Sequence, residues 1–408
     1  MQGRIRCLLR TGGPGKGALT ARLTLGVAST FPPREDGIAT FTRDLLTGVC
    51  GTDTGITARI AAITDRGSYY AYPRQVRWDI EQDDPESYAA AGHALTRAKV
   101  TLVSLQHEFG LWGDQGTLAA PFDRYDCAPA FLDALDRPVV TTLHTVLPTP
   151  RADLRAAIQL LCARSAATVV MVEVGAKILI EDYGVDPGRL VVIPHGVPEV
   201  RPVDKERVKR RLRLSGHTVI CTFGLLTRTK GIDTAIRALP AVVARHPDTL
   251  YLIMGETHPR VRKREGESYR DELSALARDL GVSRQVRFVN RYLEQQTLVR
   301  YLQATDIYVT PYRDRDQITS GTLSYALGCA CACVSTPYVY ATEALAEGRG
   351  LLTAFDNPES IARCVNLYLD DPTFRRHTEE RAVAYGREMA WSRVGARYAA
   401  LFQRVVHA

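Results

Sequence analysis

The feature that most constrains this chain is a repeated alternation of short apolar runs with longer amphipathic stretches. Short apolar runs fit strands buried on both faces of a sheet, and the stretches between them fit helices that cover those faces. In the first half we expect a helix at 38–49 and strands at 23–29, 57–63, 100–106, 139–143, 168–171 and 190–193. This order of elements predicts an α/β fold with a parallel sheet.

The alternation stops at residues 194–206, where three prolines and then several charges are typical of an interdomain linker. It then starts again, with strands expected at 219–223, 250–254, 286–289, 306–310 and 332–335, and helices at 232–245 and 294–304. Two units of nearly equal size predict two doubly wound domains that face each other across a cleft, at about residues 22–198 and 199–388. We expect residues 1–21 to form a flexible tail.

Composition excludes several classes of protein. The 408 residues are 45% hydrophobic and 24% charged, as in a globular protein, and no apolar run is long enough for a membrane span. The net charge of +7 comes mainly from scattered arginines, which predict a solvated surface and at most peripheral membrane contact, and no basic run with aromatics indicates nucleic-acid binding. Nine cysteines without an export signal favour a reducing cytoplasm, and Cys329, Cys331 and Cys333 lie in an apolar setting that predicts core residues.

Ligands of open α/β sheets bind beyond the carboxyl ends of the strands, so the loops there carry the candidate residues. Gly37 follows the first strand and opens a helix, which leaves backbone N–H groups available to an anion. After the strand at 219–223, Gly224, Arg228, Lys230 and a further glycine form an order of residues suited to a diphosphate, because phosphate needs both charge and amide donors.

A third loop passes from polar to apolar sequence at Ser320, Gly321 and Thr322, which predicts a second helix start with free amides and hydroxyls. The Asp314–Asp316 pair in the same loop resembles a metal-binding D-x-D, but the arginine between the two would oppose a divalent cation. We therefore expect no metal.

Three histidines lie at or near strand ends. His107 and His144 follow strands at the edge expected to face the cleft, so we consider both functional candidates beside the alternative of a structural role. His195 lies in the linker and is expected more simply to shape its turn.

Taken together, these residues resemble family 4 glycosyltransferases, the retaining enzymes of the GT-B fold. The resemblance covers about residues 22–404 and rests on six segments, namely PPREDGIATF, QHEFG, TLHTV, VIPHGV, FGLLTRTKG and ITSGTLSYALG. It implies two facing Rossmann-like domains and a final helix, at 389–408, that returns to the N-terminal domain.

The resemblance also implies roles for single residues. Gly37 and Gly224 would approach the donor, the amides of Ser320, Gly321 and Thr322 would bind its diphosphate, and Arg291 and Tyr292 would lie near the nucleobase. His144 would contact the transferred sugar, Lys230 would neutralise the diphosphate with Arg228 as helper, and His107 and Glu108 would face the acceptor. The family commonly has two glutamates eight positions apart, where this chain has Gln317 and Tyr325.

The resemblance implies a retaining, metal-independent transfer of a sugar from a nucleoside-diphosphate sugar to a hydroxyl of a sugar-containing or small-molecule acceptor. We expect a UDP-sugar first, then a GDP- or ADP-sugar, with no cofactor besides that donor. The missing glutamates leave a catalytically silent nucleotide-sugar-binding partner as an alternative. A sugar-nucleotide epimerase using Glu108 or His107 is another. The arginine- and alanine-rich composition is typical of a GC-rich bacterial genome. Neither the acceptor nor the oligomeric state follows from the sequence.

Overall fold

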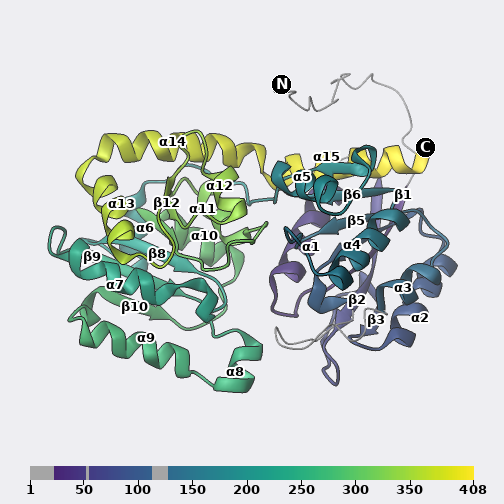
Figure 1. Ribbon diagram of the computed structural model, residues 1–408, viewed down its shortest axis with the longest axis horizontal. Coiled ribbons are helices and arrows are strands. Elements are labelled where there is room, and N and C mark those ends of the chain that lie inside the picture. Colours follow the sequence, from purple (N-terminus) through teal and green to yellow (C-terminus); the bar gives the residue numbers. More distant parts are fainter. Residues whose placement is uncertain (1–22, 52–54, 113–126) are drawn as a thin grey trace.

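The computed structural model describes residues 23–51, 55–112 and 127–408, whose strands form two parallel sheets in two lobes (Figure 1). The tail expected at 1–21 lies outside these residues. The first sheet has the order β3-β2-β1-β4-β5-β6-β7. Its strands are β1 Leu23–Ser29, β2 Ile56–Thr64, β3 Val76–Glu81, β4 Leu102–His107, β5 Val139–Leu143, β6 Ala167–Val170 and β7 Leu190–Val192.

The second sheet has the order β10-β9-β8-β11-β12-β13. Its strands are β8 Thr218–Phe223, β9 Thr249–Met254, β10 Val286–Val289, β11 Ile307–Thr310, β12 Ala332–Ser335 and β13 Leu351–Leu352. Every strand that the sequence predicts is confirmed to within two residues at each end, and in both sheets the first strand pairs in parallel with strands that come later in the chain. Sequence reasoning missed the edge strands β3 and β13. β3 alternates exposed residues with partly or fully buried ones, and β13 has only two residues.

Helices cover both sheets. In the first lobe they are α1 Gly37–Cys50, α2 Pro85–Arg97, α3 Cys127–Asp133, α4 Ala152–Arg164 and α5 Glu173–Glu181. In the second they are α6 Lys205–Leu212, α7 Ile232–Val243, α8 Pro259–Glu265, α9 Ser268–Asp279, α10 Gln295–Gln303, α11 Gly321–Gly328, α12 Val339–Ala344, α13 Pro358–Asp370 and α14 Pro372–Glu388. The central strands β4, β5, β9 and β11 are buried at every position, as their apolar sequence predicts. Cys329, Cys331 and Cys333 are confirmed as buried residues with free thiols.

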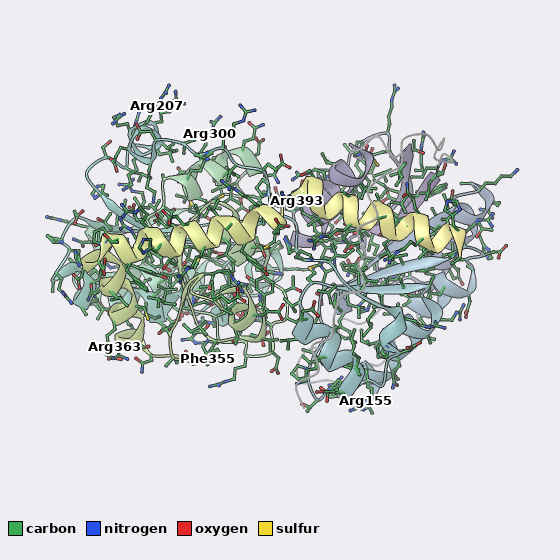
Figure 2. All side chains as sticks on the ribbon, turned by 90° about the horizontal axis from the view of Figure 1, so that it is seen from above. Arg155, Arg207, Arg300, Phe355, Arg363 and Arg393 are labelled. Carbon is green, nitrogen blue, oxygen red and sulfur yellow. The ribbon has the colours of Figure 1, made fainter. Side chains whose placement is uncertain are left out.

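The last helix, α15 Trp391–His407, crosses from the second lobe to the first and follows α14 along the top of the molecule (Figures 1 and 2). The linker meets this crossing, because the N–H of Val197 donates to the Met389 carbonyl at 2.8 Å and the N–H of Trp391 donates to the Val197 carbonyl at 3.0 Å. α15 then packs closely on α1: a Cβ on Gly48 would lie 2.3 Å from the Trp391 carbonyl oxygen. The two lobes are therefore joined by two chain crossings held to each other.

A carboxylate also links the lobes. Glu343 of α12 accepts the N–H groups of Glu173 and Val174, each at 3.0 Å, at the start of α5, whose own N-cap position provides no side-chain hydrogen bond. A charge from the second lobe thus satisfies the first amides of a helix in the first lobe.

Surface arginines such as Arg155, Arg207, Arg300 and Arg363 point outward around both lobes (Figure 2), in agreement with the solvated surface that the scattered positive charge predicts. None of the helices in the described part of the chain is both long and apolar enough to cross a lipid bilayer.

Candidate active site

The loop after β8 turns through two conformations that suit glycine. Gly224 has a φ of 130°, and Gly231 has a φ of 62° with a Cβ position only 1.9 Å from the Pro311 carbonyl oxygen. A side chain at either position would be strained, and at Gly231 it would collide with the backbone. Between the two glycines the chain forms a short 3₁₀ helix, η3 Arg228–Lys230, and Gly231 then caps α7. The two glycines therefore fix where Arg228 and Lys230 are presented.

Lys230 lies over an aromatic ring and not beside an acid. Its Nζ is 3.7 Å from the centre of the Tyr312 ring, and within the described residues it forms no ion pair. Burial lowers the pKa of Lys230 to about 8, although Asp314 opposes the shift. The Tyr312 hydroxyl is 2.7 Å from Oγ1 of Thr322, in the first turn of α11. The ammonium group thus lies near the N-terminus of that helix.

The start of α11 has the geometry of an anion site. Ser320 is its N-cap, and the Ser320 hydroxyl accepts the Leu323 N–H at 3.3 Å. The amides of Gly321 and Thr322 come before that bond, in the helical turn whose N–H groups have no partner within a helix. A Cβ on Gly321 would lie 3.0 Å from Nε2 of His195, so the side chain of this linker histidine packs against the start of α11. Gly224 is also close, since its Cβ position is 3.4 Å from Cγ2 of Thr322.

Arg228 faces the other way. Its guanidinium donates to both carboxylate oxygens of Glu272 at 2.6 Å each and lies 5.0 Å from the centre of the Tyr269 ring. The bidentate pairing with Glu272 raises the pKa of Arg228. The structure therefore separates the two predicted cations: Lys230 faces the start of α11, and Arg228 is paired with α9.

In the first lobe, His144 is buried and neutral. Its Nε2 is 3.0 Å from Oε1 of Gln106, whose amide nitrogen donates to Ser104 at 3.1 Å. This chain of bonds assigns the proton to Nε2 and leaves Nδ1 as the acceptor. Burial lowers the pKa of His144 to about 3. The edge of the Phe41 ring lies between His144 and His195, at centroid distances of 4.8 and 5.2 Å.

His107 and Glu108 are held within their own lobe. His107 is fully buried, and burial lowers its pKa to about 3. Glu108 accepts from the Thr145 hydroxyl at 2.7 Å and from the Phe109 N–H at 3.0 Å, while burial raises the pKa of its carboxyl. Both residues support the carboxyl end of β4.

A buried carboxylate from the first lobe meets the second lobe at Tyr325. Oδ2 of Asp44, on α1, accepts from the Tyr325 hydroxyl at 3.0 Å and from Nε2 of Gln295 at 2.7 Å. Its other oxygen, Oδ1, pairs with Arg43 at 2.7 Å. Asp44 and Tyr325 are 6% and 7% exposed, so three groups from α1, α10 and α11 form a closed polar junction between the lobes.

The remaining predicted donor residues lie around this junction. The Tyr292 hydroxyl is 3.0 Å from Oγ1 of Thr40, a second contact between the lobes, and neighbouring Arg291 is exposed. Gln317 donates from its side-chain amide to the Thr319 carbonyl at 2.8 Å, within its own loop. Gly37 is exposed at the start of α1, with nothing within 4 Å of its Cβ position.

The D-x-D segment at residues 314–316 forms a local turn, in which the Asp316 N–H donates to Oδ1 of Asp314 at 3.1 Å. Across the residues that the structure describes, no three His, Cys, Asp or Glu side chains gather as a metal site.

Sequence reasoning missed three residues that shape this region: Asp44, Gln295 and Tyr312. Asp44 carried a usable signal, since a carboxylate between Phe41 and Leu45 interrupts an otherwise apolar helix face. Gln295 and Tyr312 carried none, because their partners lie far away in the chain.

Two family models match this chain. "Glycosyl transferases group 1" matches residues 204–389, and "Glycosyltransferase Family 4" matches residues 118–201. A D-inositol 3-phosphate glycosyltransferase of Acidothermus cellulolyticus is 31% identical over 228 residues, covering 53% of this chain and 48% of that protein. The chain spans about half the length of this relative and of a second one from Catenulispora acidiphila, at 48% and 54%.

A longer match is a GDP-mannose-dependent monoacylated alpha-(1-6)-phosphatidylinositol monomannoside mannosyltransferase of Corynebacterium glutamicum, 25% identical and covering 94% of this chain and 98% of that protein. Among solved structures, sucrose-phosphate synthase of Thermosynechococcus elongatus superposes with a TM-score of 0.73 at 15% identity, over 94% of this chain and 99% of that one. Anabaena HepE in complex with UDP superposes with a TM-score of 0.70 at 16% identity, over 93% and 99%. At such identities these two structures show the fold alone.

The resemblance seen in the sequence motifs is thereby confirmed, as are the two facing α/β lobes. This chain belongs to the family 4 glycosyltransferases, with the GT-B fold.

Proposed function

We propose that this protein is a retaining glycosyltransferase that moves a sugar from a nucleoside-diphosphate sugar to a hydroxyl of a carbohydrate or small polyol acceptor. One observation carries the proposal: the ammonium of Lys230 lacks an ion-pair partner among the described residues and lies near the free amides at the start of α11. An unpaired, partly buried cation beside a helix N-terminus is suited to bind a diphosphate.

The reaction breaks the bond between the sugar's anomeric carbon and the diphosphate oxygen, and forms a bond from that carbon to the acceptor oxygen on the same face. A diphosphate oxygen then takes the acceptor proton, so the protein supplies no nucleophile. Lys230 and the amides of Gly321 and Thr322 stabilise the charge that develops on the leaving group. Neutral His144 accepts a hydrogen bond from a sugar hydroxyl through Nδ1, which positions the ring without adding charge.

We infer that the nucleobase lies near Tyr292. UDP-sugars remain the favoured donors, followed by GDP- and ADP-sugars. The names of the relatives include a GDP-mannose-dependent enzyme, and one structural neighbour binds UDP. Two relatives named for D-inositol 3-phosphate support a polyol as the acceptor class. In this proposal the positive charge at the diphosphate comes from Lys230 and helix amides, so the transfer needs no divalent cation.

A silent nucleotide-sugar-binding protein is the second candidate, and the junction at Tyr325 favours it. The Tyr325 hydroxyl is engaged by Asp44 and Gln295, at a position where family members commonly have a glutamate. An epimerase is less well supported, because His107 is buried and both carboxylate oxygens of Glu108 are bonded within its own lobe.

A two-stage experiment tests these proposals. Thermal-shift titrations with UDP, GDP and ADP, each with and without EDTA, identify the nucleotide that stabilises the protein. Its sugar conjugates are then incubated with inositol, inositol phosphate and simple glycosides, and release of the nucleoside diphosphate is followed. Acceptor-dependent release that is insensitive to EDTA, with an α-linked product from an α-linked donor, supports the retaining transferase. Binding without release under all conditions supports the silent protein.

A further inference from the structure

A polar cavity lies on the side of the η3 turn that carries Arg228, away from Lys230. It has a volume of about 190 Å³ and is lined mainly by α7 and α9. Its polar wall consists of Arg228, Asp233, Arg237, Tyr269, Glu272 and Arg313. None of these groups contributes to the proposed transfer, so the cavity needs its own explanation.

The ion pairs of this wall leave one of its cations without a carboxylate partner in the described residues. Arg313 donates to Asp233 at 2.7 Å and also to Asp356 at 2.6 Å, and Arg228 pairs with Glu272. Arg237 forms no ion pair within the part of the chain that the structure describes. Arg228 and Arg313 are therefore neutralised by nearby carboxylates, and Arg237 is the cation of this wall that has no carboxylate partner among the described residues.

Two buried polar atoms of the wall also lack a hydrogen-bond partner in the described residues: the hydroxyl of Tyr269 and Oδ1 of Asp233. Tyr269 is only 3% exposed, so little water from the surface reaches its ring. Buried polar atoms in folded proteins are nearly always satisfied, which makes an occupant of the cavity the simplest partner. To satisfy both atoms, an occupant has to accept a hydrogen bond from the Tyr269 hydroxyl and donate one to Oδ1 of Asp233.

The volume of the cavity and the weakness of one ion pair in its wall restrict the occupant further. Pockets for drug-sized ligands are about 300–1,000 Å³, so 190 Å³ suits a small anion and not a nucleotide. The Arg228–Glu272 pair is half exposed, with 52% and 54% of the two side chains accessible, and such pairs contribute only about 0–1 kcal/mol. Arg228 is therefore free to exchange Glu272 for a more strongly charged ligand.

We propose that this cavity is a second anion site, distinct from the donor site, which binds a phosphate group either as inorganic phosphate or as a monoester of a small polyol. The phosphate oxygens accept from Arg237, Arg228 and Tyr269. A P–OH or polyol hydroxyl donates to Oδ1 of Asp233.

The site adjoins the back of the turn that presents Lys230. The Arg313 N–H donates to the Thr229 carbonyl at 2.9 Å, and its guanidinium donates to the Arg228 carbonyl at 3.0 Å. Arg313 thus contacts both the cavity and the η3 backbone. A ligand that forms hydrogen bonds with Arg228 and Arg313 will change the stability of the η3 turn. It will thereby change the affinity for the donor.

The test measures binding of inorganic phosphate and of glycerol 3-phosphate by calorimetry, at constant ionic strength set with chloride. Four proteins are compared: wild type, Lys230→Ala, Arg237→Ala and the exposed control Arg363→Ala. Because Lys230→Ala weakens the donor site alone, we expect it to keep phosphate binding. Arg237→Ala should bind about tenfold or more weakly, since a charged hydrogen bond contributes about 1.5–3 kcal/mol. Arg363→Ala should bind as wild type does.

Two results would overturn the proposal: unchanged phosphate affinity in Arg237→Ala, or loss of all phosphate binding in Lys230→Ala. Tyr269→Phe provides a second check, because removal of the hydroxyl should weaken phosphate while the fold persists. Tighter binding of glycerol 3-phosphate than of inorganic phosphate would identify a monoester as the ligand, and the reverse order would identify the free ion. Because no nucleotide is used, failure of the proposed transferase activity leaves this measurement unaffected.

Discussion

The two sides of the η3 turn, the front with Lys230 and the back with Arg228, have different surroundings although the two residues are close in the sequence. Arg228 and Lys230 are two residues apart, yet Lys230 stacks on Tyr312 and faces the start of α11, while Arg228 pairs with Glu272 of α9. A 3₁₀ helix has about three residues per turn, so positions i and i+2 point to different sides. The comparison teaches that a cation in a loop is available to a ligand only when the fold leaves it unpaired.

The largest expected effect comes from the front of the turn. Lys230→Ala should reduce turnover about 10²–10³-fold, because it removes the cation that stabilises the leaving diphosphate. Steady-state kinetics with the donor identified by thermal shift would measure the loss. Lys230→Arg is the matched variant that keeps the charge and should retain more activity than Lys230→Ala. Near-normal turnover of Lys230→Ala would remove Lys230 from the proposed site.

A second substitution tests the polar junction between the lobes, where the Asp44 carboxylate has partners on both oxygens. Asp44→Ala removes the acceptor of Tyr325 and Gln295 and should lower kcat/KM about tenfold or more, since hydrogen bonds to charged groups contribute about 1.5–3 kcal/mol. Asp44→Asn keeps one acceptor oxygen and should fall between wild type and Asp44→Ala. Chemical denaturation measures the free energy of unfolding in parallel, and a loss of stability without any loss of kcat/KM would restrict Asp44 to a structural role.

The pH dependence of the two faces should differ as well. Burial lowers the pKa of Lys230 from 10.5 to about 8, so the free protein loses this charge as the pH rises through about 8. We expect kcat/KM to fall up to about tenfold per pH unit above that point, because this ratio reports the free enzyme. Lys230→Arg should show no such decline. A flat profile of the wild type up to pH 10 would show that the transfer does not depend on the charge of Lys230.

The lowered pKa of Lys230 also affects the free energy of unfolding. Its pH dependence is opposite to that of activity: activity falls above about pH 8, whereas stability rises. Between about pH 8 and 10.5 the unfolded chain binds more protons at Lys230 than the folded chain does, so the contribution of this residue to folding rises with pH. Urea denaturation of wild type and Lys230→Met at pH 7.5 and 9.5 would measure the contribution of Lys230 to the free energy of unfolding. The stability advantage of Lys230→Met should shrink at the higher pH, and an advantage that grows would contradict the lowered pKa.

The fold and the residues of the front face were accessible from the sequence, because both depend on local patterns. Apolar runs and the glycines at 224 and 231 determine strands and turns over a few residues. The partners of Arg228, Asp44 and Tyr325 come from elements 44, 251 and 281 positions away in the chain. Spacing along the chain says nothing about such pairs, which is why Arg228 was expected beside Lys230 and Asp44 was missed.

The smallest expected effect is also the sharpest test of the comparison. Arg228→Ala should change kcat/KM less than about threefold, because half-exposed ion pairs contribute only about 0–1 kcal/mol and the guanidinium faces α9. Glu272→Ala is its partner control: it removes the bidentate partner of Arg228 and leaves the longer ion pair with Glu265 at 3.7 Å, and steady-state kinetics of both variants should give similar, nearly normal values. If Arg228→Ala instead reduced kcat/KM as severely as Lys230→Ala, the guanidinium would have to leave Glu272 and turn toward the donor during the reaction. The two faces of the turn would then act as one site, and the separation seen in this structure would describe only the unliganded protein.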